Sequence, residues 1–489
     1  MTELNSFTAE LRGLETPQVH ETRLDGVRTV WVDAAAPFTA QLMFRVGVID
    51  EELATRGITH LVEHLALAPL RDVAHPYNGM VTLDHTAFWA AGSTGDVIAF
   101  LREVSLNLRH LPIDRLKVEA RVLMAEAMGH PGTAGSSILA HRFGARGPGL
   151  IGFEEYGLRR VSGAEVNDWA IRHFTADNAV LLLTGPPPDG LELPLRRGAH
   201  SPLPTTWAYD DLPEEPTNVR EQEAGGSLAV FGARTTALRL ATDVVRQRLE
   251  DRLRHDLGRV YAVGGEYVPL TPTEAFVVWG ADSEPAHAVE VSETLVESVR
   301  DIAQRGPSDE ELARAITKIV NQALVARDSL AQSQGLESAQ AMLFGRDPLD
   351  LVEHLGSLAD IAAGDIAAAL RRPFERAVGV LAAGAETGFA PYSPDHDNPI
   401  SGRAFRAKRG KARMVLGSDA MALQVAGEQA VLRFDQLAVS DHVQSTRRIL
   451  IDERGAWIDF DATQWWRGER LLAGLDAATP PDVVIPTMR

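Results

Sequence analysis

The sequence of 489 residues contains no cysteine, and this absence excludes several kinds of chemistry. Without thiols the chain has no disulfides, no thiolate ligands for a metal ion and no cysteine nucleophile. The absence fits a reducing compartment but does not establish one. Histidine and carboxylate side chains are what this chain can offer to a metal.

Long apolar segments are missing as well. The longest apolar runs lie near residues 179–184 and 378–383 and have the length of strands, whereas a transmembrane helix needs about 20 apolar residues. The first residues, Met1 to Asn5, lack the basic start and apolar stretch of a signal peptide. We therefore expect no membrane insertion and a cytoplasmic location.

A surplus of basic residues is also missing. The chain has 48 Lys and Arg against 67 Asp and Glu, which gives a formal net charge of −19 at pH 7. Nucleic-acid binding depends on neutralising phosphates with basic side chains, so this balance argues against a general nucleic-acid binder. An acidic surface can attract cationic peptides, but more often it is simply well solvated.

The composition is otherwise that of a globular protein, with 45% hydrophobic and 24% charged residues. This length predicts two or three domains. Strand-like segments alternate with amphipathic helices along most of the chain. We expect strands at 27–32, 40–48, 86–91, 178–185, 227–232, 266–268, 275–280 and 377–384, and helices at 96–108, 114–128, 236–257, 286–304 and 309–327.

The order of these segments predicts an α+β fold with an internal duplication. Two similar α+β parts lie on either side of residues 186–220, a stretch rich in Pro, Gly and acidic residues. A second break spans 387–412 and contains a basic run, Arg403–Arg413, after which short alternating strands follow. The predicted domains are 1–190, 221–386 and a small β-rich domain at 414–489.

The most informative segment is the pentapeptide His60-Leu61-Val62-Glu63-His64. On a helix, residues i and i+4 share a face, so the two histidines can direct imidazole nitrogens at one ion. Glu63 lies beside them and is placed to act as a general base. H-x-x-E-H is the inverzincin signature, and two histidines with a third protein ligand and an open position suit a catalytic zinc. The pattern predicts Zn²⁺ as the cofactor.

Chance is the first alternative, because a chain with 15 histidines contains such a match in roughly a few per cent of cases. Apolar residues flank the pentapeptide, however, and buried histidines without a metal would need other partners. A third ligand must come from elsewhere. Glu119 and Glu126 lie seven residues apart on nearly one face of the helix expected at 114–128. By themselves, two such glutamates are best interpreted as a solvated acidic face.

The pentapeptide followed by the segment from Glu119 to Glu126 resembles the pitrilysin/insulinase family of zinc peptidases. The resemblance implies that His60, His64 and Glu126 bind the zinc. It also implies that Glu119 supports the site without touching the metal. The segment between His64 and Glu126 is shorter than is usual in the family, and this departure bears on the shape of the substrate cleft.

Asn78 begins a segment that is similar to the family's Asn-Ala-x-Thr. The resemblance implies that Asn78 binds substrate, next to the strand that pairs with the substrate backbone. Val81 stands where the family commonly has threonine, a second departure at the cleft.

A second match lies in the other half of the chain, where Leu253–Tyr261 resembles the family's arginine–tyrosine segment. The resemblance implies that Arg254 binds substrate oxygens and that Tyr261 donates a hydrogen bond to the oxyanion of the attacked carbonyl. Without the zinc motif, the two residues would be interpreted as a surface arginine and a half-buried tyrosine.

The resemblance covers about 20–386 and carries expectations about fold and function. The expected fold is α+β, with two duplicated metallopeptidase-type α/β units that form half of a clamshell, plus the small C-terminal β-rich domain. The expected activity is that of a zinc metalloendopeptidase that hydrolyses unfolded peptides, leaders or presequences in a closed chamber. The smaller members of the family imply a homodimer, or a heterodimer with a related chain, with sites completed between subunits.

Two other interpretations stay open. The chain could be a non-catalytic or partner-dependent subunit of a heterodimeric processing peptidase, although none of the expected metal ligands is missing from it. Alternatively the C-terminal domain, which weakly resembles a pleckstrin-homology domain, could recruit a partner or substrate. Trp457, Trp465 and Trp466 would then line a binding face, but core packing is the better expectation for them.

Overall fold

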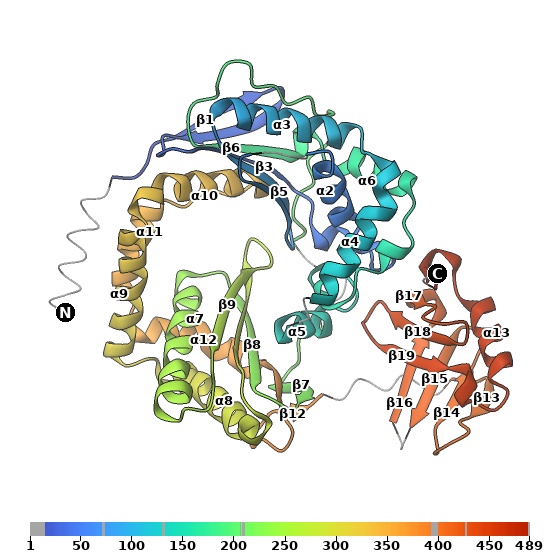
Figure 1. Ribbon diagram of the computed structural model, residues 1–489. Coiled ribbons are helices and arrows are strands. Elements are labelled where there is room, and N and C mark those ends of the chain that lie inside the picture. Colours follow the sequence, from blue (N-terminus) through green and yellow to red (C-terminus); the bar gives the residue numbers. More distant parts are fainter. Residues whose placement is uncertain are drawn as a thin grey trace.

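The computed structural model describes residues 15–70, 74–129, 133–205, 207, 211–392, 400–425 and 428–487. Met1 to Asn5 and residues 393–399 of the second predicted break lie outside the described residues. Figure 1 shows an N-terminal unit around a first sheet, a C-terminal unit around a second sheet and a tail domain of two small sheets. These three names are kept below.

The N-terminal unit is built on a six-stranded sheet with the order β1-β2-β6-β3-β5-β4. Its strands are β1 (Val19–Leu24), β2 (Val27–Val32), β3 (Phe38–Phe44), β4 (Tyr77–Val81), β5 (Thr86–Gly92) and β6 (Ala179–Leu183), and its helices are α2 (Ile58–Leu67), α3 (Thr94–Arg109), α4 (Leu116–Gly129), α5 (Ala134–Phe143) and α6 (Gly163–His173). All five residues of β6 are buried, as the continuous apolar run of a strand covered on both faces requires.

The C-terminal unit has a second six-stranded sheet with the order β12-β7-β11-β8-β10-β9. Its strands are β7 (Thr217–Gln222), β8 (Gly226–Ala233), β9 (Val263–Pro269), β10 (Glu274–Ala281), β11 (Val378–Ala382) and β12 (Ala390–Pro391), and its helices are α7 (Thr236–Leu249), α8 (Ala288–Arg305), α9 (Asp309–Val325), α10 (Leu330–Phe344), α11 (Leu351–Ser357) and α12 (Ala363–Glu375). Five strands repeat the topology of the first sheet. In each five-strand set, β2-β6-β3-β5-β4 and β7-β11-β8-β10-β9, one parallel pair is followed by three antiparallel pairs. The predicted duplication and the predicted α+β fold class are confirmed.

The two units exchange helices. Helix α5, from the first repeat, packs on the second sheet, where Ile138 and Phe143 lie against Phe231 and Phe276. Helix α10, from the second repeat, packs on the first sheet, where Leu343 joins the core beneath β2, β3, β5 and β6. Figure 1 shows the two units connected by α9 to α11 on the left and by α5 in the centre. Each sheet therefore completes its core with a helix from the other half of the chain.

The tail domain consists of two four-stranded sheets, β13-β14-β15-β16 and β19-β18-β17-β20, with one helix. Its elements are β13 (Arg403–Arg406), β14 (Arg413–Leu416), β15 (Ala420–Val425), β16 (Glu428–Arg433), β17 (Leu437–Asp441), β18 (Arg447–Asp452), β19 (Trp457–Asp461), α13 (Gly468–Ala478) and β20 (Val484–Ile485). Trp465 is buried in the core of this domain, as expected. Trp457 and Trp466 are 64% and 63% exposed, so the expectation of core packing was wrong for both.

The bounds of the sheets differ from the predicted domain boundaries. The tail begins before 414, because Arg403–Arg406 pairs with Arg413–Leu416 as a hairpin and buries Phe405 between exposed arginines. The sequence did not predict this strand because its exposed arginines belong to the basic run Arg403–Arg413. Strand β7 begins inside the predicted linker at Thr217. The helix expected at 236–257 ends as an α-helix at Leu249 and continues as a π-helical segment, Glu250–Asp256.

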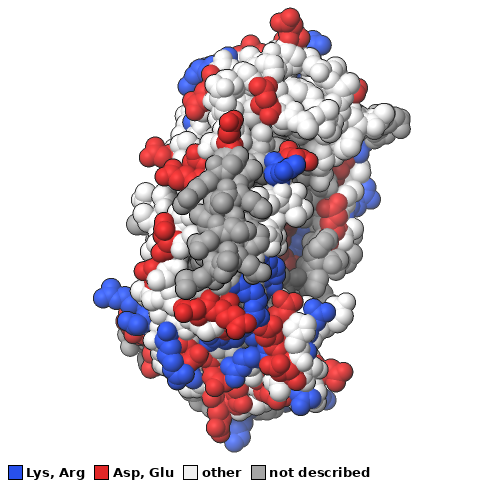
Figure 2. All heavy atoms as spheres, turned by 90° about the vertical axis from the view of Figure 1, so that its left-hand side faces the viewer, with Lys and Arg blue, Asp and Glu red and all other residues white. Residues whose placement is uncertain are grey.

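The surface of the C-terminal unit carries charges of both signs. In the lower part of Figure 2, Lys and Arg side chains lie among Asp and Glu side chains. Arg248 illustrates the pairing: it bonds Glu311 through two nitrogens and Asp301 through a third, and so links α7, α8 and α9. Within the described ranges, no helix is long and apolar enough to cross a membrane.

Candidate metal centre

The histidine motif lies on α2, and Glu51 fixes the start of this helix. Gly57 precedes α2 with a φ of 95°, a left-handed conformation that favours glycine. The buried carboxylate of Glu51 accepts hydrogen bonds from the backbone N–H groups of Gly57 and Thr59, both at 2.9 Å. A carboxylate at this end also complements the helix dipole. The apolar face of α2 packs into the core of the N-terminal unit.

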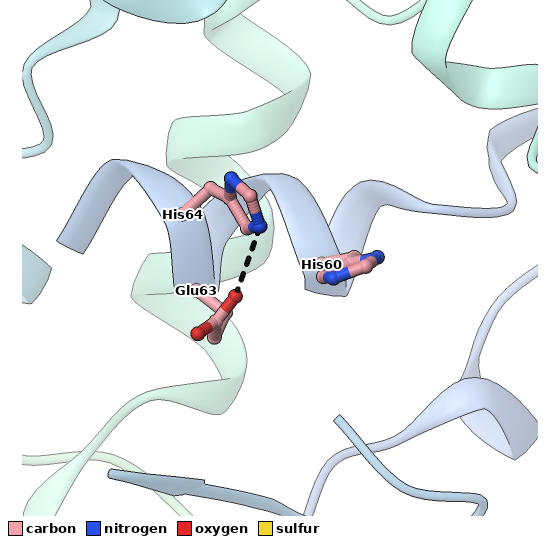
Figure 3. A group of neighbouring side chains, drawn as sticks. All are labelled: His60, Glu63 and His64. Atoms are coloured by element: carbon pink, nitrogen blue, oxygen red, sulfur yellow. Dashed lines mark ion pairs between the residues drawn. The ribbon is translucent and has the colours of Figure 1, made fainter. Parts of the chain in front are cut away.

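Figure 3 shows the side chains of His64 and Glu63 facing each other, with His60 farther along the same helix. One ligand atom from each lies within 4.8 Å of the others. Glu63 Oε2 is 3.7 Å from His64 Nε2. The i, i+4 spacing thus places two imidazoles and a carboxylate around one point, as the sequence predicts.

Each histidine has a carboxylate on its Nδ1 side. Glu155 Oε1 is 3.2 Å from His60 Nδ1, and Glu119 Oε2 is 3.6 Å from His64 Nδ1. Arg115 holds Glu119 in turn, with Nη2 2.7 Å from its Oε1. Carboxylates at Nδ1 set the tautomer that leaves Nε2 as the metal-binding nitrogen. Glu119 therefore lies where the resemblance implies a supporting carboxylate.

Glu126 approaches the same point from α4. Its Oε2 is 3.8 Å from His64 Nε2, and its side chain is half exposed. The carboxylate of Glu126 lies on the Nε2 side of His64 rather than the Nδ1 side, as does that of Glu63. The structure thus brings together His60, Glu63, His64, Glu119 and Glu126, from two helices.

Burial and charge shift the pKa values of this group in different directions. Burial raises the pKa of Glu63 to about 7, opposed by His60 and reinforced by Glu126. Burial also lowers the pKa of His64, with help from His60. For His60, burial opposes the charged form, but the hydrogen bond and the charge of Glu155 raise its pKa overall. A carboxyl that titrates near neutrality suits a group that must take up and return a proton.

Strand β4 runs past the motif as the last strand of the first sheet. Asn78 is exposed on this strand, and Gly79 faces Glu63 so closely that a Cβ there would lie 1.8 Å from Glu63 Oε1. An edge strand offers backbone groups with which an extended peptide can pair. Asn78 precedes Gly79 on this strand, so its side chain points to the opposite face of the sheet from Glu63.

Arg254 and Tyr261 are not brought to this site within one chain. Arg254 lies in the π-helical segment after α7 and pairs with Glu250 at 3.6 Å. The side chain of Tyr261 is 84% exposed. Among the described residues, no hydrogen bond or ion pair joins either of them to the histidines or to Glu63.

Two residues that no sequence pattern indicates, Glu155 and Glu51, hold His60 and the start of α2. Glu155 is 95 residues from His60 and precedes a short turn, η5 (Tyr156–Arg159), so no local spacing marks it. Arg56 contacts it at 3.3 Å and also donates to the backbone oxygen of Leu150. Only the fold brings these residues together.

The donor set fits zinc. Two neutral imidazoles and a carboxylate, with a further carboxylate beside them, match the ligand types of catalytic zinc sites. The two Nδ1-facing carboxylates match the outer contacts that metal-bound histidines require. His64 Nε2 lies within 4 Å of the carboxylates of both Glu63 and Glu126, and a bound cation would satisfy these groups together.

Comparison with known proteins reveals likeness of structure. No family model matches the sequence, and no curated protein matches it. A protease from Helicobacter pylori superposes with a TM-score of 0.63 at 15% identity, over 75% of this chain and 99% of its own. The periplasmic protease PqqL from Escherichia coli superposes with a TM-score of 0.59 at 14% identity, over 86% of this chain and 56% of PqqL. A peptidase M16 inactive domain from Pseudomonas fluorescens superposes with a TM-score of 0.60 at 15% identity, over 77% of this chain and 99% of its own.

These likenesses establish the fold. The chain has the arrangement of two α/β units that M16 peptidases use as half of a clamshell, and it spans about half the length of PqqL. One of the structures named above is an inactive domain, so the fold alone does not decide whether this chain is an enzyme. That decision rests on the side chains of the site.

Proposed function

We propose that the chain is a zinc metalloendopeptidase of the pitrilysin/insulinase (M16) family. The observation that carries the proposal is the group of His60, Glu63 and His64, whose ligand atoms lie within 4.8 Å of one another while Glu155 and Glu119 lie on the Nδ1 sides of the two histidines. A non-catalytic chain has no need of two oriented histidines and a proton-accepting carboxylate at one point. The proposed substrates are unfolded peptides, leaders or presequences.

The chain's own residues divide the work. His60, His64 and Glu126 would hold the zinc, which when bound supplies Lewis acidity to a carbonyl and lowers the pKa of water. Glu63 takes the proton of the attacking water and returns it to the leaving amine. The edge of β4 with Asn78 aligns an extended peptide beside Glu63. Alignment of this kind turns a bimolecular attack into one within a complex.

The decisive variant is Glu63→Gln, which keeps the shape of the side chain and removes its basicity. We expect loss of peptide hydrolysis with zinc content unchanged by metal analysis. Glu52→Gln is the matched control, because Glu52 is exposed and precedes the same helix. Retained hydrolysis in the Glu63 variant would refute the assignment. A peptide-library digest of the parent chain would give the cleavage preference.

We further propose that Arg254 and Tyr261 complete the site of a second subunit in a homodimer, or in a heterodimer with a related chain. Their separation from the histidines and the exposure of Tyr261 support this arrangement. A Glu63→Gln chain mixed with a Tyr261→Phe chain should recover activity, because one mixed site carries both intact residues. Failure to recover it would favour a site completed within one chain.

The alternative, a partner-dependent or non-catalytic subunit, has its own outcome. A purified parent chain that binds zinc but cleaves peptides only after a related chain is added would support it. Recruitment of substrate by the tail domain is a separate proposal, supported by the exposed Trp457 and Trp466. Substituting both by Ser should then impair cleavage of a native substrate but not of a short peptide.

A further inference from the structure

The tail domain covers two loops of the N-terminal unit with an apolar surface. These loops are residues 45–57, between β3 and α2, and residues 144–162, between α5 and α6. Strands β17 and β18 and residue Ile485 contribute the tail side of this contact. The shared buried cluster contains Leu53, Ala54, Ala145, Leu150 and Tyr156 from the N-terminal unit, and Val439, Ile451 and Ile485 from the tail. Each of these side chains is less than a tenth exposed. Well-buried apolar contact of this kind is typical of a lasting interface.

Polar contacts fix the position of the tail on these loops. Asp441 at the end of β17 pairs with Arg159 at 2.8 Å, and both side chains are largely buried. The backbone N–H of Ala145 donates to the backbone oxygen of Glu453 at 3.0 Å. Arg146 pairs with the carboxylate of the same Glu453. A buried ion pair is costly to leave half-made, so it specifies one docked position.

The covered loops are those that hold the candidate metal centre. Arg159 ends the short turn η5, and Glu155, which contacts His60 Nδ1, immediately precedes that turn. The other loop carries Glu51, whose carboxylate caps α2. A cavity of about 550 Å³ lies between this loop and the tail, and Glu51 lines it together with Leu437 of the tail.

The two loops also lock into each other without spare room. Gly157 donates its N–H to the backbone oxygen of Arg56 at 2.9 Å, and a Cβ at Gly157 would lie 2.5 Å from the backbone of Thr55. At Gly144 a Cβ would lie 2.3 Å from the backbone oxygen of Glu453. Because packed interiors transmit strain, a shift of the tail at Gly144 is expected to displace the loop that also carries Gly157 and Glu155.

We propose that the docked tail domain is part of the metal centre, and that Asp441 is a positioning residue that acts through Arg159 and Glu155 on His60. The inference rests on the proposed zinc site and assigns the tail a role in metal affinity. Binding of zinc and docking of the tail are then coupled, and each strengthens the other by the same factor.

The test uses full-length chains and reads zinc binding rather than hydrolysis. Asp441→Asn removes the charge that pairs with Arg159 and keeps the size of the side chain. The zinc dissociation constant, measured by competition with a chelator, should rise about 3- to 10-fold, no more than the lower end of the range for losing an outer contact of the histidine itself. Leu471→Ala is the control, because Leu471 is buried in the tail's own core, away from the interface. It should lower the thermal stability of the tail and leave the zinc constant unchanged.

Hydrogen exchange on the parent chain gives a second readout that needs no variant. Saturating zinc should slow exchange in β17 and β18, which face the N-terminal unit, and leave β13 to β16 unchanged. An unaltered zinc constant in Asp441→Asn, or equal effects of Asp441→Asn and Leu471→Ala, would overturn the inference. So would exchange in β17 and β18 that does not respond to zinc. Zinc binding without peptide cleavage would overturn the proposed enzyme alone, whereas absence of zinc binding would overturn both.

Discussion

Gly79 of β4 lies against the carboxylate of Glu63, so close that a Cβ added at Gly79 would sit 1.8 Å from Glu63 Oε1 and 2.8 Å from its Cγ. The edge strand and the proposed general base therefore share one small space. Position 79 sets how far the carboxylate can move from the histidines.

A graded series at position 79 tests this contact. Gly79→Ala should displace the end of the Glu63 side chain, and Gly79→Val should displace more of it. We expect kcat/KM to fall by about 10-fold and about 100-fold, because misplacing a catalytic group by about 1 Å has costs of this order. Met80→Ala is the control, because Met80 is an exposed neighbour on the same strand. Equal rates for Gly79→Val and the parent would show that Glu63 is not confined by the strand.

Glu155→Gln separates orientation of His60 from the presence of its imidazole. The amide can no longer supply the charge at His60 Nδ1 that the carboxylate supplies at 3.2 Å. Zinc affinity should weaken by about 10- to 100-fold in a chelator competition. Glu154→Gln, at the exposed neighbouring position, should behave as the parent chain does. Unchanged zinc affinity in Glu155→Gln would show that Glu155 does not orient His60 for the metal and serves only as the ion-pair partner of Arg56.

Variants of the two glutamates of α4, Glu119 and Glu126, should weaken zinc binding to different extents. Glu126 lies on the Nε2 side of His64 and Glu119 on the Nδ1 side. Glu126→Ala should therefore weaken zinc binding by more than about 100-fold, whereas Glu119→Gln should cost about 10-fold. The comparison is made by isothermal titration under one buffer condition. The reverse order would exchange the proposed roles of ligand and support.

The ion pair between Arg248 and Glu311 predicts a dependence of stability on pH. The side-chain hydrogen bond from Arg248 lowers the pKa of Glu311 to about 2, against 4.5 ordinarily. Below pH 4.5, Glu311 takes up a proton in the unfolded chain but stays ionised in the folded chain. The stabilisation is therefore complete above pH 4.5 and disappears as the pH falls toward 2. Allowing for solvent screening, it is worth about 1–2 kcal/mol.

Urea unfolding of the parent and of Glu311→Gln measures the contribution of the Arg248–Glu311 pair to the free energy of unfolding. The difference in the free energy of unfolding should be constant near neutral pH and shrink below pH 4.5. Comparing two chains at each pH removes the contribution of all other groups. A difference that persists unchanged to pH 3 would mean that the pair contributes no charge-dependent stability.

The sequence predicted the fold where the signals are local. The apolar runs of β6 and β11 form strands whose five residues are all buried, and the repeated order of elements revealed the duplication. The exchange of α5 and α10 could not be predicted in this way. A helix pattern shows that one face is apolar but not which sheet will cover it.

The same limit applies to the candidate site. His60, Glu63 and His64 are visible in five residues because helical spacing alone brings them together. Glu126 and Glu119 were implied by resemblance, and their place beside His64 depends on the packing of α4 on α2. Glu155 carries no sequence signal at all, since its proximity to His60 depends on how a loop 95 residues away packs against α2.

The helix exchange makes the stability of one unit depend on residues of the other. Leu343 of α10 is fully buried against the first sheet, although it lies in the second repeat. Leu343→Ala should lower the free energy of unfolding by about 2–5 kcal/mol, the range for a large-to-small change in a packed core. Val325→Ala, at an exposed position near the end of α9, should change it little. Hydrogen exchange should locate the loss in β2, β3, β5 and β6 as well as in α10. Protection lost in the C-terminal unit alone would contradict the exchange, because the first sheet would then hold its core without α10.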